Sequence, residues 1–276
     1  MKRHILLPTD FSDNAWSAIV YALKLYADEV CKFYILNSVA MHASTMSNLS
    51  NHLLRVMKEN ALRDLIELKE TIVASDANAN HEFEIVLSTQ DLDDAINSAV
   101  KNHEIDRIVM GTKGATGAKE LFFGSNTVKI LKQVRLCPIL IVPDEHDFIR
   151  PRQIAFPTDY KRFFSEKDLK PIKDLTELYH SKIRVLHINK EETLDEDQKH
   201  NYTNLKDALG NYEHSFHWMP DYSTKETEIR EFINDLEIDM LAMVNYRHSC
   251  LESILKEPVI KKIGFKPEVP FLVVPS

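Results

Sequence analysis

A short segment of this chain occurs twice, and the repeat limits the folds that are open to it. Residues 5–11 read Ile-Leu-Leu-Pro-Thr-Asp-Phe, and residues 154–160 read Ile-Ala-Phe-Pro-Thr-Asp-Tyr. The copies also end alike, with Pro-Ile-Leu-Ile-Val-Pro at 138–143 and Pro-Phe-Leu-Val-Val-Pro at 270–275. The chain is therefore an internal duplication, which predicts two domains of one architecture. A length of 276 residues also favours two domains over one.

Within each copy, short apolar runs alternate with stretches of helical periodicity. The apolar runs of the first copy lie near residues 3–8, 31–39, 83–87, 106–110 and 137–142. Strands that alternate with helices at this spacing predict right-handed βαβ units and a parallel sheet. The expected fold is therefore α/β, with two tandem Rossmann-like domains, each a five-stranded parallel sheet with helices on both faces. We place the domains at residues 1–146 and 152–276.

The second copy is shorter than the first. From Pro8 to Pro157 the offset is 149 residues, whereas from Pro138 to Pro270 it is 132, so 17 residues are missing from the second copy. The first copy contains a long helical pattern at about residues 46–75. We expect the shortening to fall at the corresponding helix of the second copy.

Four of the six glycines lie in one stretch, residues 111–125, between the fourth expected strand and a helical pattern. In an open α/β sheet, such a connection lies at the carboxyl end of a strand, where ligands bind and the next helix presents free N–H groups. Glycine lets phosphate oxygens approach the backbone without meeting a Cβ atom, and it allows positive φ. Ser125 is a good N-cap residue whose hydroxyl could turn to a phosphate instead. With Lys113 and Lys119 nearby, the stretch predicts an anion site.

The spacing of this stretch resembles the nucleotide motif of the universal stress protein family, Gly-x2-Gly-x9-Gly-Ser/Thr. Gly111, Gly114, Gly124 and Ser125 fill its four fixed positions. Neither the dinucleotide fingerprint nor the P-loop has this spacing. With Pro-Thr-Asp-Phe-Ser at 8–12 and the closing apolar run, the motif makes the first copy similar to a universal stress protein domain. The duplication extends the resemblance over almost the whole chain, as in tandem members of the family.

The resemblance implies an adenine nucleotide, ATP with or without Mg²⁺, at the switch point of the first sheet. It places Asp10 on the ribose or adenine side, the backbone of Val39 against adenine, and the phosphates at the glycines. Lys113 stands where the family often has His or Arg, so the charge is kept and the bidentate geometry is lost. The implied binding residues are Thr9, Asp10, Val39, Gly111, Lys113, Gly114, Gly124, Ser125 and Thr127.

The second copy has lost the motif. The residues at the places of Gly111, Lys113, Gly114, Gly124 and Ser125 are Val244, Tyr246, Arg247, Glu257 and Pro258. Every required glycine is gone, proline supplies neither hydroxyl nor N–H, and Glu257 would repel a phosphate. We therefore expect nucleotide in the first half only, with the retained Asp159 acting as a turn or cap residue.

Three functions stay open on these grounds. The first, which we prefer, is an ATP-binding universal stress protein that acts as a regulatory module. The second is a slow ATP hydrolase in which Asp10 positions Mg²⁺, and the third is a nucleotide-free protein-interaction module. The patterns H-E-x-x-H, G-x-S-x-G and C-x-x-C are absent, so the sequence carries no familiar catalytic motif. A homodimer and an unknown protein partner are both compatible with the sequence.

Composition excludes several other partners. A net charge of −8 argues against nucleic acid, because affinity for phosphate backbones comes chiefly from Lys and Arg. No apolar run approaches the roughly 18 residues of a membrane-spanning helix, and the N-terminal apolar run is too short for a signal sequence. We therefore expect a cytoplasmic protein. Cys31, Cys137 and Cys250 lie among apolar residues and suit reduced, buried thiols.

The loss of the second motif yields a first prediction, that one chain binds one nucleotide. Titration calorimetry of the purified protein with ATP should give a stoichiometry of about one per chain. Two equivalent sites per chain would contradict it, because the second copy lacks the glycines that the motif requires.

Overall fold

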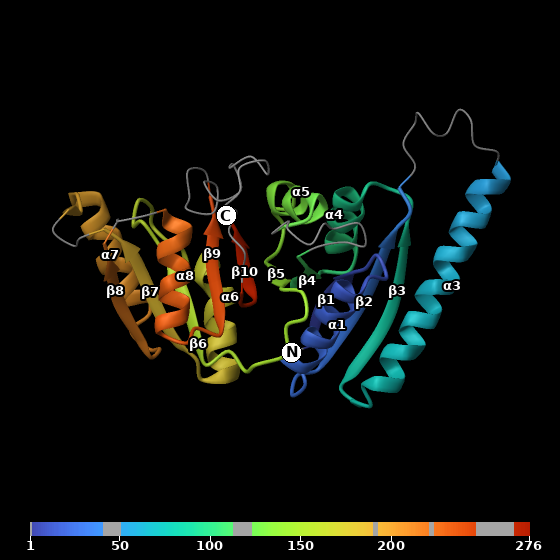
Figure 1. The fold of residues 1–276 in the computed structure, drawn as a ribbon, viewed down its shortest axis with the longest axis horizontal. Coiled ribbons are helices and arrows are strands. Elements are labelled where there is room, and N and C mark those ends of the chain that lie inside the picture. The colour runs from blue at the N-terminus through green and yellow to red at the C-terminus, as the bar shows by residue number, and fades with distance from the viewer. Residues whose placement is uncertain (1, 41–50, 113–122, 190–192, 221–223, 247–267) are drawn as a thin grey trace. The chain divides into compact units, whose positions relative to one another are not determined.

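The computed structural model describes residues 2–40, 51–112, 123–189, 193–220, 224–246 and 268–276 (Figure 1). Contacts between Cα atoms divide the chain into two compact units, Met1–Phe148 and Ile149–Ser276. Each unit is a parallel sheet with helices packed against it, so the α/β fold expected from the sequence is confirmed.

The first unit contains five parallel strands in the order β3-β2-β1-β4-β5. Its elements are β1 (Arg3–Pro8), α1 (Asp13–Leu25), β2 (Cys31–Ser38), α3 (Asn51–Ser75), β3 (His81–Ser88), α4 (Leu92–Asn102), β4 (Arg107–Gly111), α5 (Ser125–Gln133) and β5 (Ile139–Val142). Right-handed crossovers place α1 and α3 on one face of this sheet and α4 and α5 on the other. Helix α4 contacts α5 and strands β1 and β2, in agreement with that placement.

The core of the first unit lies between its sheet and the helices on both faces. Strand β5 is buried along its whole length, and β1 is buried from Ile5 to Pro8. Such continuous apolar runs are typical of parallel strands that are covered on both faces. Helix α1 starts directly after Ser12, whose Oγ atom accepts a hydrogen bond from the N–H of Ala15 and so caps the helix.

The second unit repeats this topology. Its elements are β6 (Gln153–Pro157), α6 (Glu166–Tyr179), β7 (Lys182–Ile188), α7 (Glu196–Ala208), β8 (His214–Met219), α8 (Lys225–Asp235), β9 (Met240–Asn245) and β10 (Phe271–Pro275). The strand order β10-β9-β6-β7-β8 is that of the first unit when each strand is replaced by its counterpart. Helix α3 has 25 residues and its counterpart α7 has 13, so the expected shortening falls where the sequence placed it.

Two of the three cysteines lie in the described part of the chain, and both are buried. Burial raises the pKa of the Cys31 and Cys137 thiols to about 12, because desolvation disfavours the thiolate. Cys250 lies outside the described residues. Among the helices that the structure describes, none is long and apolar enough to cross a membrane.

Asn37 and His187 occupy the same place in the two units. Strand β1 pairs Pro8 with Leu36, and β6 pairs Pro157 with Leu186, so the next residues on β2 and β7 correspond. The Asn37 side-chain amide donates to the Thr9 carbonyl at 2.8 Å, and His187 Nδ1 lies 2.9 Å from the Thr158 carbonyl oxygen. Burial lowers the pKa of His187 below its ordinary value, since desolvation disfavours the charged ring.

This lowered pKa predicts an acid-sensitive second unit. As the pH falls, the unfolded chain protonates His187 at a higher pH than the folded chain does, because folding lowers the pKa of this ring. The stabilisation that depends on a neutral His187 is therefore complete above about pH 6.5 and is lost as the pH falls below it. His187→Asn keeps a side-chain N–H for the Thr158 carbonyl, as Asn37 does for Thr9. Urea unfolding should show a smaller loss of stability between about pH 7.5 and pH 5.5 in this variant than in the parent.

Trp218 fluorescence in a Trp16→Phe background is the readout for this test, because the Trp218 ring lies 5.1 Å from that of His187. An unchanged pH dependence in His187→Asn would contradict the prediction.

Candidate functional site

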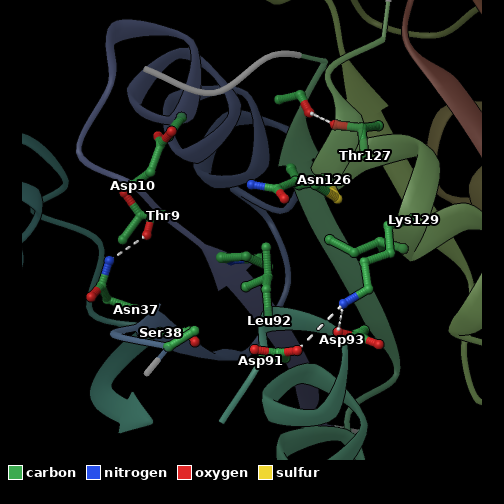
Figure 2. A pocket seen from close by; sticks show the side chains of 16 residues that line it. Thr9, Asp10, Asn37, Ser38, Asp91, Leu92, Asp93, Asn126, Thr127 and Lys129 are labelled. Carbon is green, nitrogen blue, oxygen red and sulfur yellow. Dashed lines mark hydrogen bonds and ion pairs between the residues drawn. The ribbon is translucent and has the colours of Figure 1, made fainter. Parts of the chain in front are cut away.

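A pocket opens at the carboxyl ends of the first sheet's strands. From β1 the chain passes to β2 and β3 on one side of β1, and it then crosses to β4 and β5 on the other side. The strand order therefore reverses between β1 and β4. Ligands of open α/β sheets bind at this switch point. The pocket has a volume of about 300 Å³. Its lining is Pro8, Thr9, Asp10, Ala15, Asn37, Ser38, Ala40, Asp91, Leu92, Asp93, Met110, Gly111, Asn126, Thr127, Lys129 and Ile130 (Figure 2).

The structure brings together four of the residues that the sequence nominated. Thr9, Asp10, Gly111 and Thr127 all line the pocket. Gly124 and Ser125 precede the lining residues of α5 without lining the pocket themselves, and Val39 lies between two residues that do. Lys113 and Gly114 lie outside the described residues.

Asp10 belongs to a tight turn that closes on itself. The Thr9 hydroxyl oxygen accepts the N–H of Phe11 at 3.0 Å, and Asp10 Oδ1 accepts the N–H and the hydroxyl of Ser12 at 3.2 and 2.6 Å. These bonds hold Phe11 at a φ of 63°, which a bulky side chain seldom adopts. The exposed Asp10 carboxylate is therefore a fixed group at the pocket rim.

Gly111 is required by packing against helix α1. A Cβ atom at this position would lie 2.4 Å from Asn14 Oδ1, 2.7 Å from its Cγ and 3.0 Å from its carbonyl oxygen. The sequence suggested that glycine makes room here for a phosphate or for positive φ. In the structure the missing Cβ makes room for α1, and no described glycine has a positive φ.

The start of α5 differs from the prediction. Gly124, with a φ of −61° and a ψ of 154°, is the N-cap residue, and Ser125 is the first residue of the helix. Glycine is itself an acceptable N-cap, so the helix begins one residue earlier than expected. The Gly124 N–H donates to the Thr112 carbonyl at 2.7 Å, and the first hydrogen bond of the helix runs from the Val128 N–H to the Gly124 carbonyl at 3.0 Å. The N–H groups of residues 125–127 precede that bond, so they have no acceptor within the helix.

Thr127 fastens this first turn to the end of β4. Its buried hydroxyl lies 3.3 Å from the carbonyl oxygen of Gly111 and 3.1 Å from that of Thr112. The hydroxyl hydrogen is thus directed at the backbone, which leaves only lone pairs for a ligand. The side chain of Thr127 therefore positions α5, and it has no donor left for the phosphate that the resemblance assigned to it.

Val39 has a similar limitation. Its N–H donates to the Ser88 carbonyl at 2.9 Å and extends the pairing of β2 with β3. The resemblance gave the backbone of Val39 to adenine, but with the N–H engaged only its carbonyl can accept a new bond.

Several lining residues escaped sequence reasoning, chiefly Asn37, Asp91, Asp93, Asn126 and Lys129. The hydrogen bond from Lys129 lowers the pKa of the Asp93 carboxyl, and the same bond raises the pKa of the Lys129 ammonium. Lys129 Nζ lies 2.6 Å from Asp93 Oδ1 and 3.8 Å from Asp91 Oδ2. Asp91 could have been found, because it follows a strand whose carboxyl end lies at the ligand-binding edge. Asp93 on α4 and Asn126 and Lys129 on α5 could not have been found from the sequence, because only tertiary packing brings these two helices together.

Comparison with known proteins now adds to this geometry. The sequence profile described as the Universal stress protein family matches residues 1–143, over half of the chain. The chain belongs to the universal stress protein family. Universal stress protein MJ0531 of Methanocaldococcus jannaschii is 26% identical over 150 residues, which cover 51% of this chain and 81% of that protein.

Solved structures agree on the fold. A universal stress protein from Archaeoglobus fulgidus superposes with a TM-score of 0.73 at 19% identity, covering 99% of this chain and 96% of that chain. The functionally unknown protein PA1789 from Pseudomonas aeruginosa superposes with a TM-score of 0.58 at 15% identity, covering 99% and 92%. At these identities the two likenesses support the architecture of this universal stress protein and nothing finer.

The second unit has a polar contact across the equivalent place. Tyr246, which follows β9, donates its hydroxyl to Asp159 Oδ1 at 2.7 Å, and the guanidinium of Arg162 lies 4.9 Å from the centre of the Tyr246 ring. Asp159 also accepts the N–H of Lys161 at 3.0 Å. The helix after it, α6, is capped by Ser165, so Asp159 is a turn residue rather than a helix cap.

The contact between Gly111 and Asn14 yields a prediction for the first unit. Gly111→Ala should lower its free energy of unfolding by about 1–3 kcal/mol, the usual cost of overpacking. Adding Asn14→Ala removes the two nearest atoms, at 2.4 and 2.7 Å, and should restore part of the loss. Urea unfolding followed by Trp16 fluorescence in a Trp218→Phe background measures both. Parental stability in Gly111→Ala would show that α1 moves aside freely.

Proposed function

We propose that the first unit binds ATP and that the protein acts as a regulatory nucleotide-binding module. The observation that carries the proposal is the pocket at the switch point, into which the first turn of α5 places Asn126 and Thr127. Its volume of about 300 Å³ is at the lower end of the roughly 300–1,000 Å³ range of small-molecule sites. The glycine spacing supports the same ligand class.

The phosphates are assigned to the start of α5. The unpaired N–H groups of a first helical turn and the positive end of the helix dipole together favour anions. The charged side chains that line the described pocket are Asp10, Asp91, Asp93 and Lys129, three acids and one base. Such a lining repels phosphates, so we assign the attraction for phosphates to the start of α5. In the sequence, Lys113 and Lys119 add positive charge to the glycine stretch that precedes this helix.

A bound Mg²⁺ would depend on the nucleotide. In the described parts of the chain, no three His, Cys, Asp or Glu side chains converge as a metal-binding group. Mg²⁺ commonly binds through one or two carboxylates together with substrate phosphates. Asp10, exposed at the rim, is the carboxylate that we assign to this role.

The second unit does not share this function in our proposal. Val244 stands at the place of Gly111, and the Tyr246–Asp159 hydrogen bond crosses the edge where a ligand would enter. Nucleotide would therefore occupy the first unit alone.

The proposal predicts that Gly124→Val loses detectable ATP binding while Ser125→Ala only weakens it. A φ of −61° is open to valine, so the variant should fold. Its side chain would crowd the N–H groups that receive the phosphates. Removing the Ser125 hydroxyl deletes one hydrogen bond to a charged group, worth about 1.5–3 kcal/mol, and leaves the backbone donors in place.

Titration calorimetry measures the affinities, and circular dichroism checks the folding of each variant. Ser165→Ala is the matched control, because it removes a serine hydroxyl from the start of a helix in the second unit, α6. Its ATP affinity should equal that of the parent. If Gly124→Val bound ATP as tightly as the parent, the start of α5 would not be the phosphate site, and the interaction-module hypothesis would be favoured. Mass spectrometry of nucleotide released from purified protein gives an independent check.

A further inference from the structure

A hydrogen-bond donor and an acceptor lie side by side in the pocket wall. Lys129 Nζ, on α5, is 3.8 Å from Oδ2 of Asp91, which directly precedes α4. Both side chains line the pocket, and each is about two-fifths exposed, at 42% and 38%. We refer to these two residues as the Asp91–Lys129 pair. Figure 2 shows them across the pocket from Asp10.

Neighbouring residues hold the pair in place. Asp93 Oδ1 accepts from Lys129 Nζ at 2.6 Å, and the Asp93 side chain is only 12% exposed, so it anchors the ammonium from inside the wall. Asp91 is the N-cap residue of α4, yet its side chain makes no capping hydrogen bond to that helix. Its carboxylate instead lies beside Lys129, toward the pocket.

The charge of this wall decides which part of a nucleotide can lie against it. Two carboxylates and one ammonium leave it acidic, so it would repel phosphates. The apolar side chain of Leu92 lies beside Asp91 in the lining and offers a surface for a flat ring. With the phosphates assigned to the first turn of α5, the side of the pocket that holds Asp91 and the Lys129 ammonium is left for the base.

We propose that the Asp91–Lys129 pair selects adenine by its edge. Adenine presents an amino donor beside a ring-nitrogen acceptor, whereas guanine presents two acceptors, O6 and N7, on the corresponding edge. The Asp91 carboxylate accepts from the amino group, and the Lys129 ammonium donates to the adjacent ring nitrogen. A 6-oxo purine would instead turn an oxygen toward the carboxylate. This inference rests on the proposed function and adds the residues that determine its base specificity.

The test compares ATP with inosine triphosphate, in which a 6-oxo group replaces the 6-amino group. Titration calorimetry of the full chain should show at least about tenfold tighter binding of ATP by the parent, the scale of one good base contact. In Asp91→Asn the ratio should fall to within about threefold, because an asparagine amide can either donate or accept. Asp91→Ser, which keeps a residue favoured at helix N-caps while removing the carboxylate, should narrow the ratio as well.

Asp94→Asn is the matched control. Asp94 lies in the first turn of α4, three residues after Asp91, and is exposed outside this pocket, so the substitution removes the same charge while leaving the pair intact. Its affinity ratio should equal that of the parent, which separates base selection from a general gain in affinity for anions. Circular dichroism confirms that each variant is folded.

The outcomes distinguish the two proposals. Equal affinity of the parent for the two nucleotides, or an unchanged ratio in both Asp91 variants, would overturn the assignment of the pair and leave ATP binding standing. If the parent bound neither nucleotide, the proposed function would fail and this inference with it. A narrowed ratio in both Asp91 variants, with Asp94→Asn unchanged, supports the pair as the base-reading element.

Discussion

The pairing of β1 with β4 is the constraint on which the site depends. These strands pair at only two positions, Ile5 with Arg107 and Leu6 with Ile108, while β1 and β2 pair at six. Pairing thus stops short of the carboxyl ends of β1 and β4. The connections leave these ends in opposite directions, so no crossover helix lies over the crevice between them. The pocket occupies this place, with walls from the turn after β1 and from the first turns of α4 and α5.

A small set of contacts keeps the crevice open and its walls fixed. Gly111 lets α1 approach the end of β4 closely, since any Cβ there would meet Asn14. Thr127 ties the start of α5 to the same strand end through the Gly111 and Thr112 carbonyls. Part of the glycine motif therefore serves packing. A motif that looks like a ligand cradle can thus owe some of its residues to the architecture that presents the ligand.

The two units show what this architecture retains when the glycine motif is lost. Both keep the Thr-Asp-aromatic turn with a positive φ, at Phe11 in the first and Tyr160 in the second. Both keep a side-chain bond from the second strand to the threonine carbonyl, from Asn37 or His187. The repeated sequence builds the same turn in both units, where the threonine hydroxyl oxygen accepts the N–H of Phe11 or of Tyr160.

The sequence by itself determined the architecture and pointed to the edge of the first sheet where the pocket lies. Apolar runs alternating with helical periods require parallel βαβ units, and the repeat of Pro-Thr-Asp with an aromatic residue showed that there are two of them. The motif at Gly111 to Ser125 pointed to the connection after β4, because glycine is costly in a structured segment unless the backbone needs it.

Only the tertiary structure decided what the individual side chains do. The contacts that fix these roles join segments that lie apart in the chain. They are the contacts of Gly111 and Thr127, the hydrogen bond of the Val39 N–H, and the cluster of Asp91, Asp93 and Lys129. Sequence periodicity gives the buried face of a helix. It does not give the residue on another helix that this face meets, because that depends on how the helices pack across the sheet.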